Sequence, residues 1–169
     1  LSVERVERAL DRLFAELPDQ SWGANLIHSP NEPDLESTIA ELYIQRGVSR
    51  VSAAAYMKLT PYILRYALHG LHRDQNGKIV RKNHVFAKIS RPEVAAHFVN
   101  PAPERMIRDL LQRGWITAEE ADLAMRVPVA SQLTIEADSG GHTDNQSLSA
   151  LFPIIADLRD RAAKAHQYE

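Results

Sequence analysis

The chain has 169 residues and a formal net charge of -2 with histidine neutral, and it is 44% hydrophobic and 25% charged. These values suit one ordinary folded domain and, without a basic stripe, they exclude an electrostatic nucleic-acid footprint. The absence of cysteine excludes disulfides, thiolate nucleophiles and cysteine-based zinc sites. No apolar run approaches a membrane span, and the first residues form an amphipathic helix pattern rather than a signal peptide. We therefore expect a cytoplasmic protein that binds neither nucleic acid nor membrane.

Helix and strand patterns alternate through the first third of the chain. In order, they predict a helix over 3–17, a strand over 22–27, a helix over 33–46 and a strand over 48–54. Pro33 suits the first turn of a helix, and Gly47 is a natural helix end. The strands are short and apolar, which is typical of strands buried on both faces in a parallel sheet.

The alternation continues with two interruptions. The patterns predict a helix over 60–69, an excursion over 71–82, a strand over 84–90, helices over 91–98, 104–113 and 117–125, a strand over 132–137 and a last helix over 147–165. In the excursion, Asn76-Gly77 suits a two-residue hairpin loop. Thr117 and Glu120 have the spacing of a capping box, and the acids Glu119, Glu120 and Asp122 are interpreted as a solvated helix face.

Four strands, each followed by a helix, make half of a (β/α)8 barrel, which typically needs about 250 residues. We therefore predict an α/β fold: a partial TIM (β/α)8 barrel of about four parallel strands with flanking helices. Residues 1–169 would form one segment, with a helical insertion near 101–127, before the last strand. An open four-stranded sheet is the alternative.

Polar residues lie within the apolar strand patterns and directly after them. Barrels and parallel sheets have their catalytic and binding sites at the carboxyl ends of strands. Asn25 and Lys88 lie inside strand patterns, where a buried amide or ammonium needs a partner. A ligand would provide that partner; the alternative for Lys88 is a structural ion pair with Glu136.

The last strand pattern leads into Ser139-Gly140-Gly141-His142. Gly140 and Gly141 allow the backbone to approach a ligand closely, and His142 has an ordinary pKa near neutrality. The alternative is that the glycines only form a turn between two elements and that His142 is solvated. We expect no metal site, because His69-x-x-His72 has no third ligand placed by spacing.

These residues resemble a known motif. Glu136 followed by Ser139-Gly140-Gly141-His142 resembles the Glu-x-x-(Ser/Ala)-Gly-Gly-His signature of flavin-dependent barrels related to nitronate monooxygenase (2-nitropropane dioxygenase) and flavin-containing enoyl-acyl-carrier-protein reductases. Five stretches, the last of which includes this motif, are similar to the trans-acting enoyl reductase of polyunsaturated fatty acid synthases and trans-acyltransferase polyketide synthases: 23–33, 50–53, 70–73, 87–95 and 136–145. The resemblance covers essentially the whole chain.

The resemblance implies an FMN-dependent enoyl reductase that uses NADPH and reduces enoyl thioesters on an acyl carrier protein. The site residues that it implies are His142 as the catalytic residue near the substrate and, around the flavin, Asn25, Lys88, Glu136, Gly140 and Gly141. A cationic or hydrogen-bonding His142 would polarise the thioester carbonyl.

Two parts of the family's barrel have no counterpart in this sequence: a first strand, and the late strands that carry glycine-rich phosphate loops. We therefore expect an internal segment of a longer enzyme, with the remainder of the barrel and a polyketide or fatty acid synthase complex as its partners, and an isolated segment that is inactive and binds FMN weakly or not at all. The alternatives are a nitronate monooxygenase-like flavin oxidase and an inactive barrel fragment that serves as an assembly surface.

Overall fold

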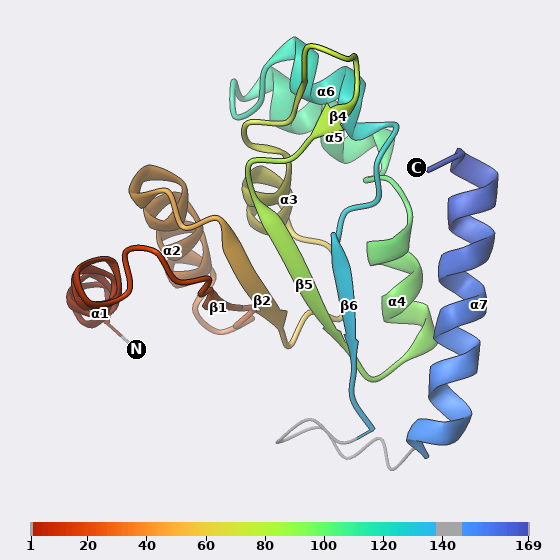
Figure 1. Ribbon diagram of the computed structural model, residues 1–169, viewed down its shortest axis with the longest axis horizontal. Helices are drawn as coiled ribbons and strands as arrows, with labels where there is room; N and C mark the ends of the chain where they lie inside the picture. Colours follow the sequence, from red (N-terminus) through yellow and green to blue (C-terminus); the bar gives the residue numbers. More distant parts are fainter. Residues whose placement is uncertain (1, 138–146, 169) are drawn as a thin grey trace.

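The computed structural model describes residues 2–137 and 147–168, and its main feature is one parallel sheet (Figure 1). Its strands are β1 (Ala24–Ile27), β2 (Arg50–Ala54), β5 (His84–Ile89) and β6 (Gln132–Ile135). They are hydrogen-bonded in the order β1-β2-β5-β6, and every pair is parallel. Spatial neighbours therefore follow chain order, as they do in a consecutive part of a (β/α)8 barrel. The predicted α/β class and parallel sheet are confirmed.

Helices follow each strand of this sheet and return the chain to the edge at which the next strand begins. These helices are α2 (Pro33–Arg46), α3 (Pro61–Leu68), α4 (Pro92–Val99) and α7 (Leu148–His166), and α1 (Val3–Glu16) precedes the sheet. α2 packs on β1 and on α3, whereas α4 packs on β5 and on α7. No helix of the described residues is long and apolar enough to cross a membrane.

The two faces of the sheet differ in their cover. Side chains that alternate along the strands toward the helices are buried, and they include Leu26, Val51, Ala53, Val85, Ala87 and Ile89. The opposite face is open in the described part of the chain: Asn25 is exposed and Ile27 is 50% exposed. The expectation that these strands are buried on both faces is therefore wrong for the described residues, because helices cover one face only.

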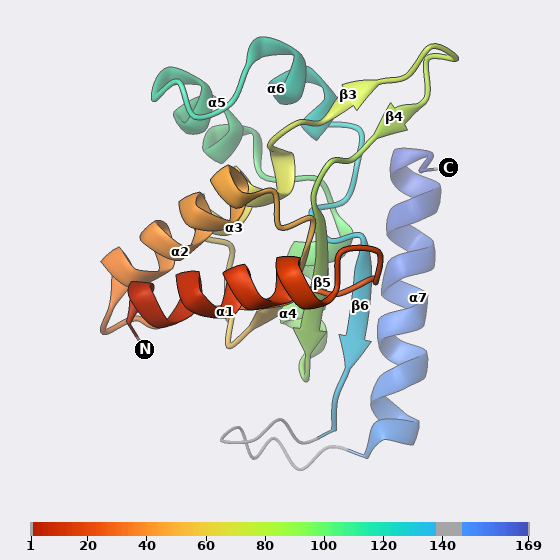
Figure 2. The same cartoon turned by 60° about the vertical axis from the view of Figure 1, so that its left-hand side comes forward.

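The two interruptions of the alternation lie together at the amino end of the sheet (Figures 1 and 2). One is the hairpin of β3 (His72–Arg73) and β4 (Ile79–Val80), and the other is the pair α5 (Glu104–Gln112) and α6 (Ala118–Ala124). α5 and α6 pack on α3, and α6 also contacts β3. The helical insertion is therefore remote from the ends of the strands, where a barrel site is expected.

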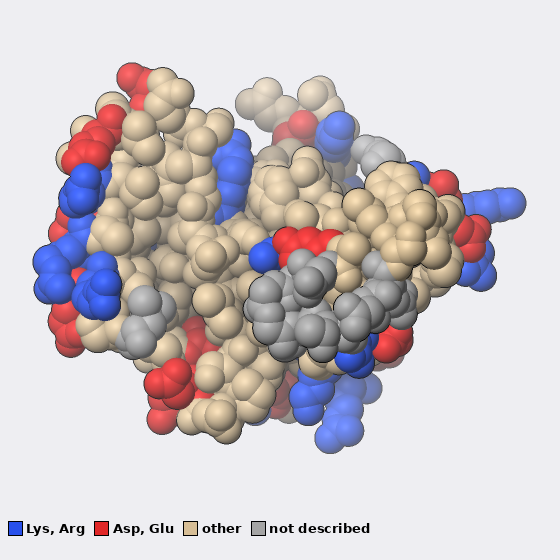
Figure 3. All heavy atoms as spheres, turned by 90° about the horizontal axis from the view of Figure 1, so that it is seen from below, with Lys and Arg blue, Asp and Glu red and all other residues tan. Residues whose placement is uncertain are grey.

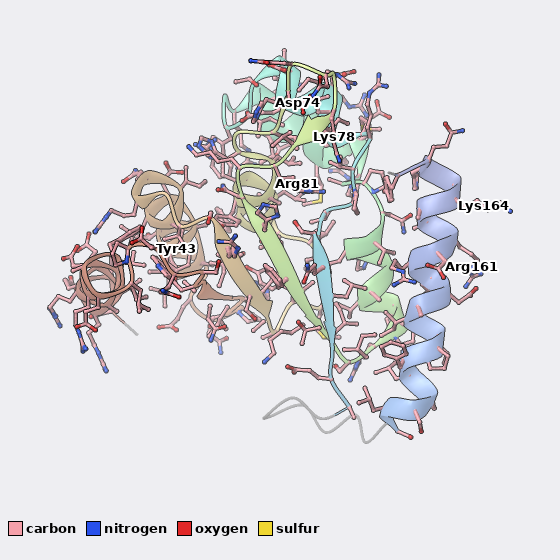
Figure 4. The ribbon with its side chains drawn as sticks, viewed as in Figure 1. Tyr43, Asp74, Lys78, Arg81, Arg161 and Lys164 are labelled. Carbon is pink, nitrogen blue, oxygen red and sulfur yellow. The ribbon has the colours of Figure 1, made fainter. Side chains whose placement is uncertain are left out.

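The hairpin loop is longer than predicted. The amide of Asp74 donates to the carbonyl of Lys78 at 2.9 Å, so the loop has three residues rather than two. Gly77 has φ of +79°, a left-handed value that glycine adopts without strain. This is the turn plus glycine bulge that is common in three-residue hairpins. Figure 4 labels Asp74 and Lys78 at this end of the molecule.

Glu120 has a structural role that its sequence context does not reveal. Its carboxylate completes the predicted capping box by accepting from the amide of Thr117 at 2.7 Å, and it also accepts from the amide of Gly70. The residue is only 7% exposed, so the interpretation of Glu120 as solvated is wrong. The contact attaches α6 to the turn that precedes the hairpin.

We expect Glu120→Ala to lower the free energy of unfolding by about 2 kcal/mol, because it leaves the buried amide of Gly70 unpaired and removes a helix cap. Glu119→Ala, one position earlier on an exposed site of the same helix, is the matched control and is expected to change stability by less than about 0.5 kcal/mol. Urea unfolding of both variants measures the difference. Equal stabilities would contradict the anchoring role of Glu120.

Candidate functional site

Polar side chains gather on the open face toward the edge at which the strands end. Figure 3 views the molecule from this end, and many of its charged groups lie toward the periphery. Of the predicted site residues, Asn25, Lys88 and Glu136 are described, and all three belong to this face or to the end of its strands. Barrels and parallel sheets bind their ligands at this end.

Lys88 and Glu136 form an ion pair across the two neighbouring strands β5 and β6. Lys88 Nζ lies 3.1 Å from Glu136 Oε1, and the side chains are 34% and 23% exposed. The strand register explains the contact, because Lys88 is paired with Thr134 and the amide of Glu136 donates to the carbonyl of Ile89 at 2.8 Å. The ion pair that the sequence left open is therefore present, and both side chains keep part of their surface for a ligand.

Asn25 lies on the same face but two strands away. It is in register with Ser52, which is in register with Phe86 on β5, so it is about 10 Å from that strand at the usual strand spacing. A hollow of about 510 Å³ is lined by Asn25, Ser52, Phe86 and Thr134 and by residues at and before the start of β1 and β2, such as Trp22 and Arg50; Lys88 and Glu136 do not line it. The hydroxyl of Tyr43 donates to the carbonyl of Asn25 at 2.9 Å, and Figure 4 labels Tyr43 on α2, the helix that packs on β1. This hydrogen bond holds the backbone of Asn25 in place.

The predicted glycine–histidine turn lies outside the described residues. Gly140, Gly141 and His142 belong to 138–146, which separates β6 from α7. Their proposed contacts with flavin and substrate stay predictions.

A second cluster at the same edge includes a residue that the sequence did not single out, Glu36. Its side chain is 1% exposed, and it lies in the first turns of α2. Glu36 Oε2 is 2.6 Å from His28 Nδ1, and Glu36 Oε1 accepts from the hydroxyls of Tyr56, at 3.0 Å, and Thr60. His28 follows β1, whereas Tyr56 and Thr60 follow β2, so one carboxylate joins two neighbouring loops.

Tyr56 and the residue before it have unusual properties in this cluster. Burial, followed by the negative charge of Glu36, raises the pKa of the Tyr56 hydroxyl well above its ordinary value. The Tyr56 ring also stacks against the His28 ring, with centroids 5.5 Å apart. Directly before Tyr56, Ala55 has φ of +62°, an uncommon value for a residue with a Cβ atom and one that is often found at functional sites.

The described residues contain no group of three or more histidine, cysteine, aspartate or glutamate side chains that could hold a metal ion. His72 instead has its Nδ1 atom 2.9 Å from the carbonyl oxygen of Gly70.

Comparison with known proteins shows which larger proteins contain a similar segment. No protein-family model matches the chain. The chain is 44% identical over 161 residues to a polyunsaturated fatty acid synthase protein of Thraustochytrium sp., a match that covers 95% of this chain and 11% of that protein. It is 41% identical over 169 residues to the polyketide biosynthesis protein PksE of Bacillus subtilis, a match that covers 99% of this chain and 22% of that protein.

A solved structure gives the decisive observation. The enoyl reductase domain of MlnA, from the macrolactin biosynthesis cluster of Bacillus amyloliquefaciens, superimposes with a TM-score of 0.93 and 34% identity, and the match covers 99% of this chain and 38% of that one. The chain is homologous to part of an enoyl reductase domain. The chain spans less than a quarter of the length of the two biosynthetic proteins above.

We expect a double-mutant cycle of Lys88→Met and Glu136→Gln to give a coupling free energy of about 0.5–1 kcal/mol, because the pair is close but partly solvated. The coupling is expected to shrink in about 1 M salt, which screens solvated charges. Urea unfolding of the four proteins measures it. The exposed pair Asp157 and Arg161 on α7 is the control, with a smaller coupling; a cycle with no coupling at Lys88 and Glu136 would contradict the ion pair.

Proposed function

We propose that this chain is part of an FMN-dependent enoyl reductase that acts in trans within polyketide or polyunsaturated fatty acid synthesis. The reaction is reduction of the α,β-double bond of an enoyl thioester on acyl carrier protein, with NADPH as the source of electrons. The observation that carries the proposal is the superposition on a solved enoyl reductase domain over 99% of this chain. Similarity to proteins of polyketide and polyunsaturated fatty acid synthesis supports the same setting.

The open face of the sheet suits the inner surface of a barrel. Its strands run in chain order, and its side chains include Asn25 and Ile27, which are exposed in the described part of the chain. We propose that the remainder of a (β/α)8 barrel covers this face in the working enzyme. Such a barrel would operate in the cytoplasm together with a synthase complex and its carrier proteins.

The donor set on this face fits the ring system of FMN. An isoalloxazine offers both an N–H donor and several carbonyl and ring-nitrogen acceptors along one edge. The amide of Asn25 can donate and accept, the ammonium of Lys88 donates, and the carboxylate of Glu136 accepts. These three residues would hold the ring edge, and Gly140 and Gly141 would allow close backbone approach.

When bound, FMN supplies the hydride transfer that protein side chains cannot perform. The protein contributes position and charge. Because Lys88 is already paired with Glu136 at 3.1 Å, its ammonium is held at one place on the face before any ligand arrives. A preorganised donor of this kind stabilises negative charge without reorganisation during the reaction.

His142 is the proposed substrate-side group. Reduction of an enoyl thioester builds negative charge on the thioester oxygen, and an imidazole N–H that donates to this oxygen would stabilise the charge. In the sequence, His142 follows Ile135, the last residue of β6, by seven positions, and β6 pairs with the strand that carries Lys88.

In the natural full-length protein, His142→Ala is expected to lower the turnover of crotonyl-carrier protein by about 10²–10⁴-fold while flavin stays bound, because the residue acts on substrate rather than on cofactor. NADPH consumption and flavin absorbance are the two measurements. His97→Ala, at an exposed site of α4, is the control and is expected to behave as the unmodified protein.

Undiminished turnover in His142→Ala would remove His142 from the reaction. A protein that consumes no NADPH with the enoyl carrier but oxidises a nitronate with oxygen would replace the proposed reductase with an oxidase.

Lys88→Met is expected to weaken flavin binding by about tenfold, because it removes one charged hydrogen bond to the ring edge. Lys78→Met is the matched control, since Lys78 is exposed in the hairpin at the opposite end of the sheet (Figure 4). Flavin fluorescence titration of the full-length apoprotein measures both affinities. Equal affinities for the two variants would contradict the assignment of Lys88.

A further inference from the structure

The structure assigns His28 a role in binding the pantetheine arm of the acyl carrier, with Glu36 as the positioning residue that fixes its ring. This inference rests on the proposed function for the identity of the substrate, but it uses side chains outside the flavin-facing group. The observation that carries it is a buried carboxylate that holds one nitrogen of a partly exposed imidazole at the rim of the sheet.

The hydrogen-bond network determines which nitrogen of His28 carries the hydrogen. Thr60 Oγ1 accepts from the amide of Ile63 at 3.2 Å, so its own hydrogen is free to be donated to Glu36. Tyr56 donates its hydroxyl hydrogen to the same carboxylate. Because two hydroxyls already donate to this carboxylate, we assign the hydrogen of its 2.6 Å contact with His28 to Nδ1. In the neutral ring, His28 Nε2 is then a hydrogen-bond acceptor.

This acceptor is available to a ligand. His28 Nε2 has no hydrogen-bond partner in the described part of the chain, and the buried unpartnered side-chain atoms found there belong to Arg81 and Tyr168. Nε2 is not among those buried atoms, and the His28 side chain is 18% exposed. The ring cannot easily rotate away, because it is also stacked on Tyr56.

A hydrogen-bond acceptor at His28 Nε2 would bind a part of the substrate that has an N–H or O–H donor. The enoyl chain and its thioester offer acceptors or apolar atoms but no N–H or O–H donor, whereas the pantetheine arm carries amide N–H groups. His28 follows β1, and its amide is bonded to the carbonyl of Ala54 at the end of β2, so it lies on the rim. A carrier protein cannot enter a barrel, and its arm must cross the rim to deliver the thioester to the carboxyl-terminal face.

His28→Asn is the informative variant, because the asparagine amide can still donate to Glu36 but has no group at the position of Nε2. In the natural full-length protein, we expect it to weaken the binding of butyryl-pantetheine by about tenfold, through the loss of one hydrogen bond in a partly buried site. The affinity for S-ethyl thiobutyrate, which lacks the arm, is expected to change much less. Isothermal titration with both probes measures the two affinities, and His97→Asn is the matched control.

Glu36→Gln tests the positioning role by a signature that a merely structural residue would not change. Nitrogen-15 NMR of the histidine ring is expected to show His28 with its hydrogen on Nδ1 in the unmodified protein and a mixture of tautomers in the variant. Addition of butyryl-pantetheine is expected to shift the Nε2 resonance of the unmodified protein. A ring that already carries its hydrogen on Nε2 would overturn the assignment.

Further outcomes keep this inference separate from the proposed function. If His28→Asn binds butyryl-pantetheine as tightly as the unmodified protein, the inference fails, whether or not the enzyme reduces enoyl thioesters. If the expected loss of binding appears in a protein that consumes no NADPH, the inference stands and the reductase function fails. If the variant instead weakens NADPH binding, the donor belongs to the nicotinamide amide and the pantetheine assignment is wrong.

Discussion

The cover of the sheet by helices on one face is the constraint on which the rest of this structure depends. Each strand returns through a helix, and the helices bury one set of alternating side chains, such as Leu26 and Val85. The other set is less buried in the described chain, so polar side chains there carry a smaller desolvation penalty. Asn25, Ser52 and Lys88 belong to that second set. The same alternation therefore builds the core and supplies the candidate site.

The amino and carboxyl ends of the strands carry different elements: insertions lie at the amino end, and the candidate site residues lie at the carboxyl end. The hairpin and the pair α5 and α6 are inserted where strands begin, and Glu120 attaches them to the turn at Gly70. Residues that follow strands, including His28, Tyr56 and Glu136, are at the other end. Large insertions at the amino end can stabilise the domain without obstructing the end at which a ligand would bind.

Helix boundaries could be predicted from the sequence where a few neighbouring residues determine them. Pro33, Gly47 and the Thr117–Glu120 capping box mark helix boundaries through the backbone geometry of a few residues, and all of them are found as expected. Burial was harder to predict, because it depends on neighbours distant in the chain. Ile27 reads as a core residue, yet it is 50% exposed, since nothing in the described chain covers its face. Glu120 has the sequence context of a surface acid, yet one of the two amides from which it accepts, that of Gly70, is fifty residues away.

Glu36 shows why the second cluster escaped sequence reasoning and why it matters. An acid in the first turns of a helix is ordinarily explained by the helix dipole alone, and that explanation requires no tertiary partner. A carboxylate buried to 1% exposure, however, requires donors, and here they come from His28, Tyr56 and Thr60, on two different loops. The loops must keep their relative positions for the charge to stay satisfied. The free energy of burying one carboxylate thus fixes the rim on which an incoming substrate would be recognised.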